Sequence, residues 1–482
     1  MRSSLMFQGT GSDVGKSFIV AGLCRAALRR GISVAPFKPQ NMSNNAAVTD
    51  DGGEIGRAQW VQAIAAGRKP SVHMNPVLLK PESDRRAQVI VQGKVWDTAE
   101  ARDYQNRKRL LLSVVMESYE TLKSDADLVL VEGAGSPAET NLRRGDIANM
   151  GFALAADVPV VLIGDIDRGG VIASIVGTHA VLEKSDRAQI VGTIINRFRG
   201  NISLFDDGIK DITARTNWPC FGVLPWLQTA HQLPAEDAVV LERSISDEKD
   251  RKLKIAVPMV SRIANFDDLD PLIAEKGVEV TFVPPGKPLP RDTDLIILAG
   301  TKSTLSDMQF LINQGWDIDI KAHVRQGGAV LGLCGGYQML GHNLFDPDGA
   351  DGDLTNQKGL GLLDIETRMV PEKTVRNLQG ATEEGHSFDG YEIHVGQTDG
   401  ADTNRPFVVI DGVPYGASAE RKPIWGCYLH GLFSSDDFRA SFLKRFSMAA
   451  SSTRYRKTVD AALDDIAASF ETHLDIEAML EL

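Results

Sequence analysis

Two stretches of this 482-residue chain combine residue types and spacings that could do chemistry. Residues 9–17, Gly-Thr-Gly-Ser-Asp-Val-Gly-Lys-Ser, are typical of a loop that binds phosphate groups. Residues 332–336, Gly-Leu-Cys-Gly-Gly, are typical of a tight turn that presents a cysteine nucleophile. Together they suggest that one half activates a carboxylate with ATP, while the other half releases ammonia from glutamine.

The first motif is expected to join a strand to the N-terminus of a helix. Backbone N–H groups there point at a bound anion, and the helix dipole favours negative charge. Lys16 would reach the transferring phosphate, and the hydroxyl of Ser17 would bind Mg²⁺. Five residues separate Gly9 from Gly15 where the standard motif has four, so the loop is a variant. The predicted phosphate-binding residues are Gly11, Ser12, Asp13, Val14, Gly15, Lys16 and Ser17.

Acidic residues at strand ends are the expected source of further metal ligands. Glu132 follows an apolar strand, and Glu54 opens the segment Glu-Ile-Gly-Arg-Ala-Gln. Both are therefore predicted to bind Mg²⁺ together with Ser17. Asp165 and Asp167 also follow a strand, where the ligands of parallel sheets gather, and Asp165 is the alternative ligand if Glu132 is not one.

The second motif is expected to place Cys334 in a sharp turn between a strand and a helix. Small flanking residues permit the strained backbone that projects a nucleophile. A helix N-terminus lowers the pKa of a thiol and aims N–H groups at an oxyanion. Gly335, beside the cysteine, and Gly300, after another predicted strand, are the expected sides of that oxyanion hole.

The general base that would serve Cys334 is predicted to be His430. It follows the segment Trp-Gly-Cys-Tyr-Leu, which has the pattern of a buried strand. His386 and His394 are the competing candidates, and neither follows such a pattern. The other cysteines are expected to pack as small apolar residues.

Apolar runs that alternate with amphipathic stretches must position these motifs. This alternation predicts an α/β fold in which helices cover mostly parallel sheets, arranged as two doubly wound domains. The expected strands are residues 4–8, 32–37, 128–131, 158–163 and 190–195 in the first domain, and 254–260, 278–283, 295–299 and 329–333 in the second.

A charged stretch with few apolar residues marks the predicted boundary. We expect a first domain at residues 1–235, a linker at 236–252, a second domain at 253–449 and a helical tail at 450–482.

The composition indicates a globular protein of the cytoplasm. The formal net charge of −12 argues against nucleic acid or an anionic membrane as a partner, since both favour basic surfaces. The four cysteines show no disulfide or zinc spacing, which indicates a reducing compartment. We expect no secretory segment and no apolar run of the ~20 residues that a membrane helix needs. Homo-oligomerisation is left open.

The motifs resemble known families in both halves. The second half is similar to class I, triad-type glutamine amidotransferases. The first half is similar to the dethiobiotin synthetase family, whose phosphate loop has the same five-residue gap. Their combination resembles the cobyrinic/cobyric acid amidase family of corrinoid biosynthesis over about residues 3–446. Residues 38–45 and 164–170, Lys-Pro-Gln-Asn-Met-Ser-Asn-Asn and Gly-Asp-Ile-Asp-Arg-Gly-Gly, resemble the branch that acts on adenosylcobyrinic acid a,c-diamide.

The resemblance implies a ligase reaction with ATP and Mg²⁺. Carboxylates b, d, e and g of adenosylcobyrinic acid a,c-diamide would be phosphorylated and then converted to amides by ammonia from glutamine. It also implies that Lys38 contacts phosphate or substrate and that Asn196 contacts adenine. The resulting candidates for substrate contacts are Asn41, Asp165, Asp167 and Arg168.

One departure and two alternatives accompany this interpretation. Many triad amidotransferases have a glutamate two residues after the histidine, where this chain has Leu432, so the partner that orients His430 is not identified. The first alternative is the sister enzyme that amidates the a and c carboxylates. The second is a nucleotide-dependent switch of the ParA/MinD type, which would need a second lysine early in the loop and would leave Cys334 without a role.

Overall fold

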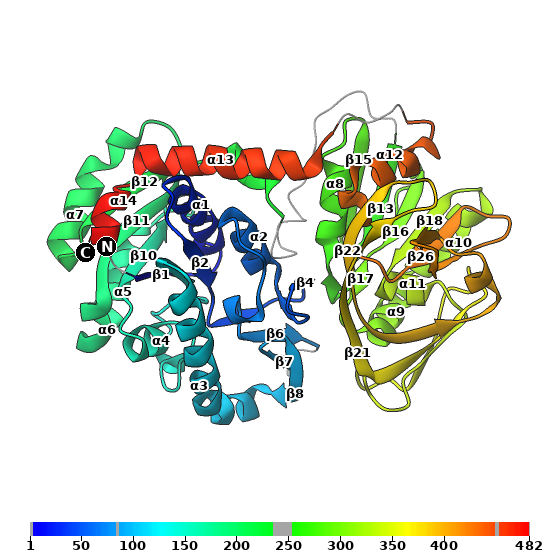
Figure 1. The fold of residues 1–482 in the computed structure, drawn as a ribbon, viewed down its shortest axis with the longest axis horizontal. Coiled ribbons are helices and arrows are strands. Elements are labelled where there is room, and N and C mark those ends of the chain that lie inside the picture. Colours follow the sequence, from blue (N-terminus) through cyan, green and yellow to red (C-terminus); the bar gives the residue numbers. More distant parts are fainter. Residues whose placement is uncertain (1–2, 83–85, 235–252, 449–452, 482) are drawn as a thin grey trace.

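Two α/β domains lie side by side in the computed structural model, which describes residues 3–82, 86–234, 253–448 and 453–481 (Figure 1). Each domain is built on a six-stranded sheet. The predicted linker at residues 236–252 lies outside the described residues. Within the residues that are described, no helix is both long and apolar enough to cross a membrane.

The amino-terminal sheet is parallel throughout, with the order β12-β11-β10-β1-β9-β2. Successive residues of β1 point to opposite faces of the sheet and pack in two different apolar clusters. Met6 belongs to the cluster on one face, and Leu5 and Phe7 belong to the cluster on the other. Helices cover both faces, which confirms the doubly wound class. The strands are β1 (Ser4–Gly9), β2 (Val34–Phe37), β9 (Leu128–Glu132), β10 (Val160–Asp165), β11 (Ile190–Phe198) and β12 (Cys220–Pro225). The helices are α1 (Lys16–Arg29), α2 (Arg57–Ala65), α3 (Ala101–Asp125), α4 (Met150–Ala155), α5 (Val171–Val181), α6 (Lys184–Gln189) and α7 (Asp206–Thr216).

The second sheet has the order β15-β13-β16-β18-β26-β25, parallel except for β25. Its strands are β13 (Leu253–Pro258), β15 (Val278–Val283), β16 (Leu295–Leu298), β18 (Ala329–Leu333), β25 (Ala417–Ser418) and β26 (Ile424–Cys427). Its helices are α8 (Asp270–Ile273), α9 (Thr304–Asn313), α10 (Trp316–Arg325), α11 (Gly335–Met339) and α12 (Asp436–Lys444). Short strands beside it are β14 (Ile263–Ala264), β17 (Gly300–Thr301), β19 (Asn343–Phe345), β20 (Asn356–Lys358), β23 (Val408–Ile410) and β24 (Val413–Tyr415).

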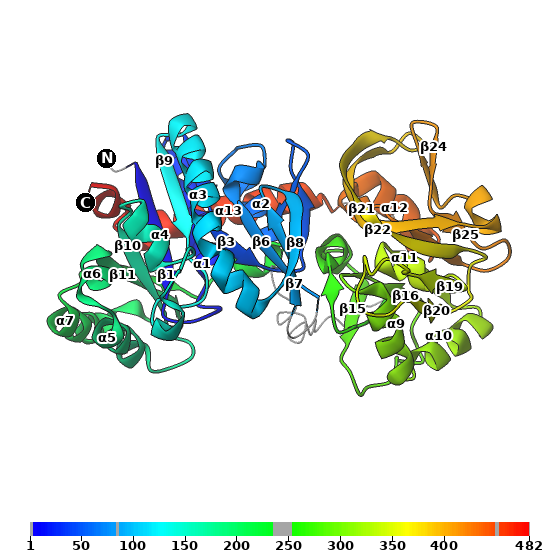
Figure 2. The same cartoon turned by 90° about the horizontal axis from the view of Figure 1, so that it is seen from below.

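The region between the two main sheets was not predicted from the sequence. It contains a small sheet of β3 (Gln40–Met42), β6 (Val77–Pro81), β7 (Arg86–Val91) and β8 (Lys94–Glu100), and a hairpin of β4 (Ala46–Val48) and β5 (Glu54–Gly56). A long hairpin of β21 (Glu366–Ala381) and β22 (Ser387–Asp399) faces them from the second domain (Figures 1 and 2). A shared apolar cluster joins the domains, made of Ala46, Val48, Leu78 and Ile90 with Tyr391 and Ile393.

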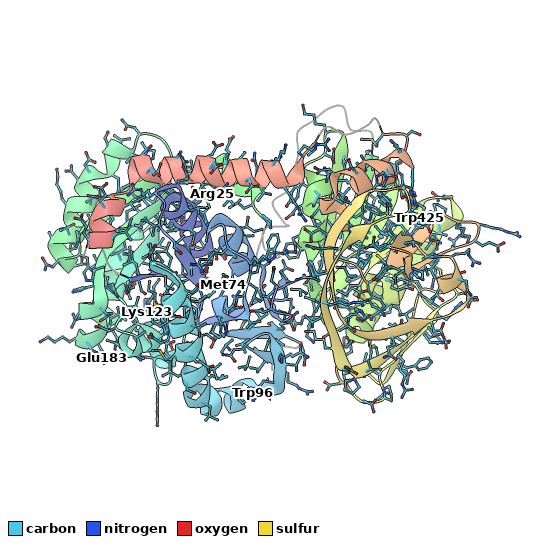
Figure 3. The ribbon with its side chains drawn as sticks, viewed as in Figure 1. Arg25, Met74, Trp96, Lys123, Glu183 and Trp425 are labelled. Carbon is cyan, nitrogen blue, oxygen red and sulfur yellow. The ribbon has the colours of Figure 1, made fainter. Side chains whose placement is uncertain are left out.

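The carboxyl-terminal helices return to the amino-terminal domain. Helix α13 (Tyr455–His473) lies across α1, and α14 (Ile476–Glu481) follows it (Figure 1). Phe470 is fully buried and packs against Gly22 of α1. A Cβ atom on Gly22 would lie only 2.3 Å from the ring of Phe470. Figure 3 shows Arg25 of α1 beneath α13, and its Nε donates to Asp464 Oδ1 at 2.7 Å. The tail is therefore part of the packing of the phosphate-loop domain.

We expect Phe470→Ala to destabilise the amino-terminal domain. Removal of a fully buried phenylalanine ring leaves a cavity between α1 and α13, which typically costs about 3–5 kcal/mol. Thermal unfolding followed by calorimetry should show a lowered transition, whereas the exposed Leu204→Ala should not change it. An unchanged transition in Phe470→Ala would show that the tail is dispensable for the domain.

Candidate active sites

The loop between β1 and α1 has the geometry of a phosphate cradle. Gly15 has a φ of 95° at the start of α1, and a Cβ there would lie 2.3 Å from Nδ2 of Asn196. The side chain of Lys16 folds across the loop, and its Nζ donates to the carbonyl oxygens of Gly11 and Gly135 at 3.0 Å each. The ammonium group is thus held at the centre of the loop, where it can exchange these carbonyl partners for a phosphate.

Glu132, at the end of β9, gathers the polar groups beside this loop. Ser17 Oγ and Lys38 Nζ donate to its Oε1 at 2.7 and 2.8 Å. On the other oxygen, Nε2 of Gln62 donates at 2.6 Å and Nε2 of Gln59 at 3.3 Å. The structure therefore brings the predicted Ser17, Lys38 and Glu132 together. Sequence reasoning missed both glutamines, although they lie on one helix three residues apart.

The oxygen atoms of Ser17 and Glu132 fit a divalent cation of the Mg²⁺ type. Among the described residues no cluster of three or more His, Cys, Asp or Glu side chains could hold a metal alone. Mg²⁺ commonly takes one or two protein oxygens and completes its shell with water and substrate phosphates. A serine oxygen and a carboxylate at the mouth of a phosphate loop suit that requirement.

Glu54 pairs with two lysines in this structure, and its role as a Mg²⁺ ligand stays a prediction. Its carboxylate is fully buried and accepts from Lys80 Nζ at 2.9 Å and from Lys373 Nζ of the second domain. Burial alone would raise the pKa of Glu54, but the two lysines lower it to about 2. Both oxygens of Glu54 are therefore engaged by lysines, one from each domain.

Asn196 and Asn41 make protein contacts that the sequence did not anticipate. Nδ2 of Asn196 donates to the carbonyl oxygen of Val14 at 2.9 Å, so this side chain supports the loop backbone. Nδ2 of Asn41 donates to Oε1 of Gln59 at 2.8 Å, which links the segment 38–45 to helix α2. Adenine and substrate contacts by these residues stay predictions.

The acidic loop after β10 lies next to the phosphate loop. Arg168 approaches Asp13 at 3.4 Å and Asp165 at 3.4 Å. Asp165 is buried and also pairs with Arg197 at 2.8 Å, while Asp167 pairs with Arg199 at 2.6 Å. The structure thus places Asp165, Asp167 and Arg168 at the same sheet edge as Lys16, in a network of compensated charges. Their roles toward a substrate stay predictions.

Cys334 occupies the strained turn that the sequence predicted. It lies between β18 and α11 with φ 50° and ψ −109°, a conformation that is costly for a residue with a side chain. It is buried, and its Sγ lies 3.4 Å from the carbonyl oxygen of Ile393. Strain of this kind persists where the surrounding structure enforces it, and nucleophile turns are a recurrent example.

The structure supplies the partner of His430 that the sequence left unidentified. Nδ1 of His430 lies 2.6 Å from Oδ2 of Asp268, and the other oxygen of Asp268 accepts from the backbone N–H of Gly431 at 2.8 Å. Burial alone would lower the pKa of His430. The charge and hydrogen bond of Asp268, together with a hydrogen bond to Cys334, outweigh burial and raise the pKa to about 10. The three side chains form a Cys-His-Asp arrangement.

The predicted oxyanion residues surround the same cavity. A Cβ on Gly300 would lie 3.5 Å from Cε1 of His430, and one on Gly335 would lie 2.5 Å from Cγ2 of Thr301. The cavity encloses about 60 Å³ and includes side chains of both domains in its wall. Its lining includes Cys334, His430, Gly300 and Gly335 from one domain, and Lys80 and Gln88 from the other.

The two competing histidines differ in position. His394 lines the cavity, but it stacks on Tyr428 at a centroid distance of 3.8 Å, and burial lowers its pKa to about 4. His386 lies at the turn of the β21–β22 hairpin, where its backbone N–H donates to Thr382. Only His430 combines a contact to Cys334 with a carboxylate partner among these three.

Comparisons with known proteins agree with this two-part architecture. The family model of the CobQ/CobB/MinD/ParA nucleotide binding domain matches residues 5–240, and that of the CobB/CobQ-like glutamine amidotransferase domain matches residues 254–438. Cobyric acid synthase of Mesorhizobium japonicum is 59% identical and that of Brucella anthropi is 60% identical, each with 100% of both chains covered. The chain belongs to the cobyric acid synthase family.

Family membership removes the nucleotide-switch alternative, because the relatives match the chain from end to end and include the amidotransferase half. Among solved structures, PurLQS from Thermotoga maritima matches 44% of this chain with 98% of its own, at 15% identity and a TM-score of 0.30. That likeness is too weak to add to the family assignment.

We expect Asp268→Asn to impair glutamine hydrolysis in a folded protein. Without the carboxylate, the imidazole of His430 loses the group that fixes its orientation and stabilises its charge, and comparable changes lower kcat by roughly 10²–10⁴-fold. A steady-state glutaminase assay measures this. The matched control is Asp402→Asn, which removes another buried carboxylate of the same domain and should keep near-normal kcat. Equal losses in both variants would deny Asp268 a special role.

The raised pKa of His430 gives this contact a pH signature. A histidine with a raised pKa in the folded state contributes stability that is fully present below its unfolded pKa, about 6.5, and is lost as the pH rises through the folded value of about 10. Thermal midpoints of the wild type and Asp268→Asn should therefore differ most near pH 6 and draw closer toward pH 10. A difference that is constant over this range would contradict the raised pKa.

Proposed function

We propose that this chain is a glutamine-hydrolysing ligase that amidates the b, d, e and g carboxylates of adenosylcobyrinic acid a,c-diamide with ATP and Mg²⁺. The observation that carries the proposal is the Cys334–His430–Asp268 arrangement in a cavity whose wall includes the nucleotide-binding domain. Full-length similarity to cobyric acid synthases supports the choice of substrate over the sister reaction at a and c.

Cys334 and His430 would carry out the hydrolytic half-reaction. The thiolate of Cys334 attacks the side-chain carbonyl carbon of glutamine, and backbone N–H groups near Gly300 and Gly335 stabilise the oxyanion. His430 delivers a proton to the departing ammonia, and a glutamyl thioester remains on Cys334. Water activated by His430 then releases glutamate. Asp268 holds the imidazole in place throughout.

The phosphate-loop domain would carry out the activating half-reaction. Bound ATP and Mg²⁺ supply the phosphoryl group and neutralise its charge. Lys16 can turn from its carbonyl partners toward the transferring phosphoryl, and the loop N–H groups hold the remaining oxygens. Ser17 and Glu132 would hold the metal, with Lys38 nearby. The acyl phosphate provides a leaving group that ammonia can displace at neutral pH.

Each half-reaction is assigned to one of the two domains. We assign carboxylate activation to residues 1–235 and ammonia production to 253–449. Helices α13 and α14 of the predicted tail at 450–482 pack on the first domain. The composition and the cysteine spacing support a cytoplasmic location for these reactions.

We expect Cys334→Ala to separate the two half-reactions. Glutamine-dependent amidation should be lost by ~10⁴-fold or more, because the covalent route has no substitute. Amidation supported by ammonium salt at mildly alkaline pH should persist, since the phosphate site is intact. Mass spectrometry of the corrinoid product measures both, with Cys220→Ala as the control for loss of a thiol. Loss of both activities in folded Cys334→Ala would defeat the two-site proposal.

Lys16→Ala should have the complementary effect. Amidation should fall by at least ~10²-fold with either nitrogen source, as is typical when one preorganised charge is removed. Glutamine hydrolysis should continue, because Cys334 lies in the other domain. The exposed Lys210→Ala serves as the control. Near-normal amidation by folded Lys16→Ala would show that the loop is structural only.

A further inference from the structure

The nucleotide-binding domain contributes an arginine to the surroundings of His430. Asp267 and Asp268 are neighbours in one short segment, yet only Asp268 reaches His430. Asp267 instead forms an ion pair with Arg57, the first residue of helix α2 in the other domain. Both partners are at most 7% exposed, so this ion pair is almost fully withdrawn from water.

Arg57 also touches the aromatic ring that supports His430. Its Nη2 donates to the hydroxyl of Tyr391 at 2.8 Å. The ring of Tyr391 stacks on the imidazole of His430, with centroids 5.0 Å apart and planes inclined by 17°. Backbone hydrogen bonds of 2.9 and 3.2 Å join the same two residues in both directions. The guanidinium of Arg57 therefore contacts Tyr391, which stacks on His430. It also contacts Asp267, which precedes the acidic partner of His430 in the chain.

A second contact from the nucleotide-binding domain holds the same segment. The backbone N–H of Asn265 donates to Oδ1 of Asn45 at 2.7 Å. The side-chain Nδ2 of Asn265 donates to the carbonyl oxygen of Ala46 at 3.1 Å and to the hydroxyl of Tyr391 at 2.9 Å. Asn45 belongs to the segment 38–45, and this contact gives that motif a docking role.

Charge explains why the arginine matters. Two adjacent buried carboxylates repel each other, and removal of a buried partner leaves an uncompensated charge that is strongly unfavourable. Oδ1 of Asp267 and Nε of Arg57 are buried and have no hydrogen-bond partner among the described residues. Without Arg57, the carboxylate of Asp267 would lose its ion-pair partner. It could then compete with Asp268 for His430, or its repulsion of Asp268 could shift the backbone that carries both residues.

We propose that Arg57 is a positioning residue for glutamine hydrolysis, which the nucleotide-binding domain supplies to the amidotransferase site. It neutralises Asp267 and holds Tyr391, so that Asp268 alone faces His430. The glutaminase geometry is complete only when the two domains are docked. This inference rests on the proposed function, because it assumes that His430 serves Cys334.

The test compares Arg57→Met with Arg86→Met in the full-length protein. Arg86 also forms an ion pair across the domain boundary, with Asp353 at 3.0 Å, but at the surface. Arg57→Met should lower kcat for glutamine hydrolysis roughly ten- to a hundredfold, as is usual for residues that orient a catalytic side chain from behind, with a much smaller change in KM. Ammonium-dependent amidation should be retained, and Arg86→Met should match the wild type.

A second substitution distinguishes positioning from general destabilisation. If Arg57 acts by neutralising Asp267, Arg57→Met/Asp267→Asn should recover part of the kcat lost in Arg57→Met, which a double-mutant cycle measures. If Arg57→Met does not fold, Tyr391→Phe removes the hydroxyl between Arg57 and Asn265 and should still lower kcat.

Three results would overturn the inference: a wild-type kcat in folded Arg57→Met, equal loss of the glutamine- and ammonium-dependent reactions, or a wild-type kcat in Tyr391→Phe when Arg57→Met cannot be obtained. Absence of glutaminase activity in the wild type would instead overturn the proposed function.

Discussion

Charges that lie between the two domains, largely withdrawn from water, are the constraint on which the rest of the structure depends. Arg57 pairs with Asp267, Lys373 with Glu54, and Lys302 with Glu82, and each pair takes one partner from each domain. A charge that is withdrawn from water needs its partner, so separation of the domains would leave these groups uncompensated unless water replaced the contact. Such pairs contribute little net stability, but they specify one docked arrangement. The cavity beside Cys334 depends on that arrangement.

Helix α2 contacts the surroundings of both sites. Its first residue, Arg57, reaches Asp267, while Gln59 and Gln62 on the same helix donate to Glu132 beside the phosphate loop. The helix is nine residues long, and seven of its residues are buried. A change in the ligands of Glu132 and a change around His430 would therefore act on neighbouring turns of one short helix. The fold brings both chemistries to this helix rather than leaving them as independent modules.

The sequence predicted the site motifs whose residues are close together in the chain. It did not predict contacts between residues that are far apart in the chain and meet only in the folded protein. Lys16 and Cys334 were identifiable because each chemistry needs a turn and a helix start within a few residues. Asp268 is 162 positions from His430, and no local pattern connects them. The pairing of Glu54 with Lys373 was likewise not predictable, because the two residues are 319 positions apart.

The same reasoning explains the outcome for the fold. The central strands are continuous apolar runs and were predicted, with boundaries that differ by a few residues from those observed. The β21–β22 hairpin was missed because its first strand is largely exposed or half-buried and polar, so it has no clear period-two pattern.

The central claim is that nitrogen released at Cys334 becomes the amide formed at the phosphate-loop domain. The most direct measurement is mass spectrometry of the corrinoid made by the wild type from adenosylcobyrinic acid a,c-diamide, ATP, Mg²⁺ and glutamine labelled with ¹⁵N in its amide. The two-site arrangement predicts labelled amides at the b, d, e and g positions. A corrinoid that gains no label from glutamine, or gains it at other positions, would contradict that claim.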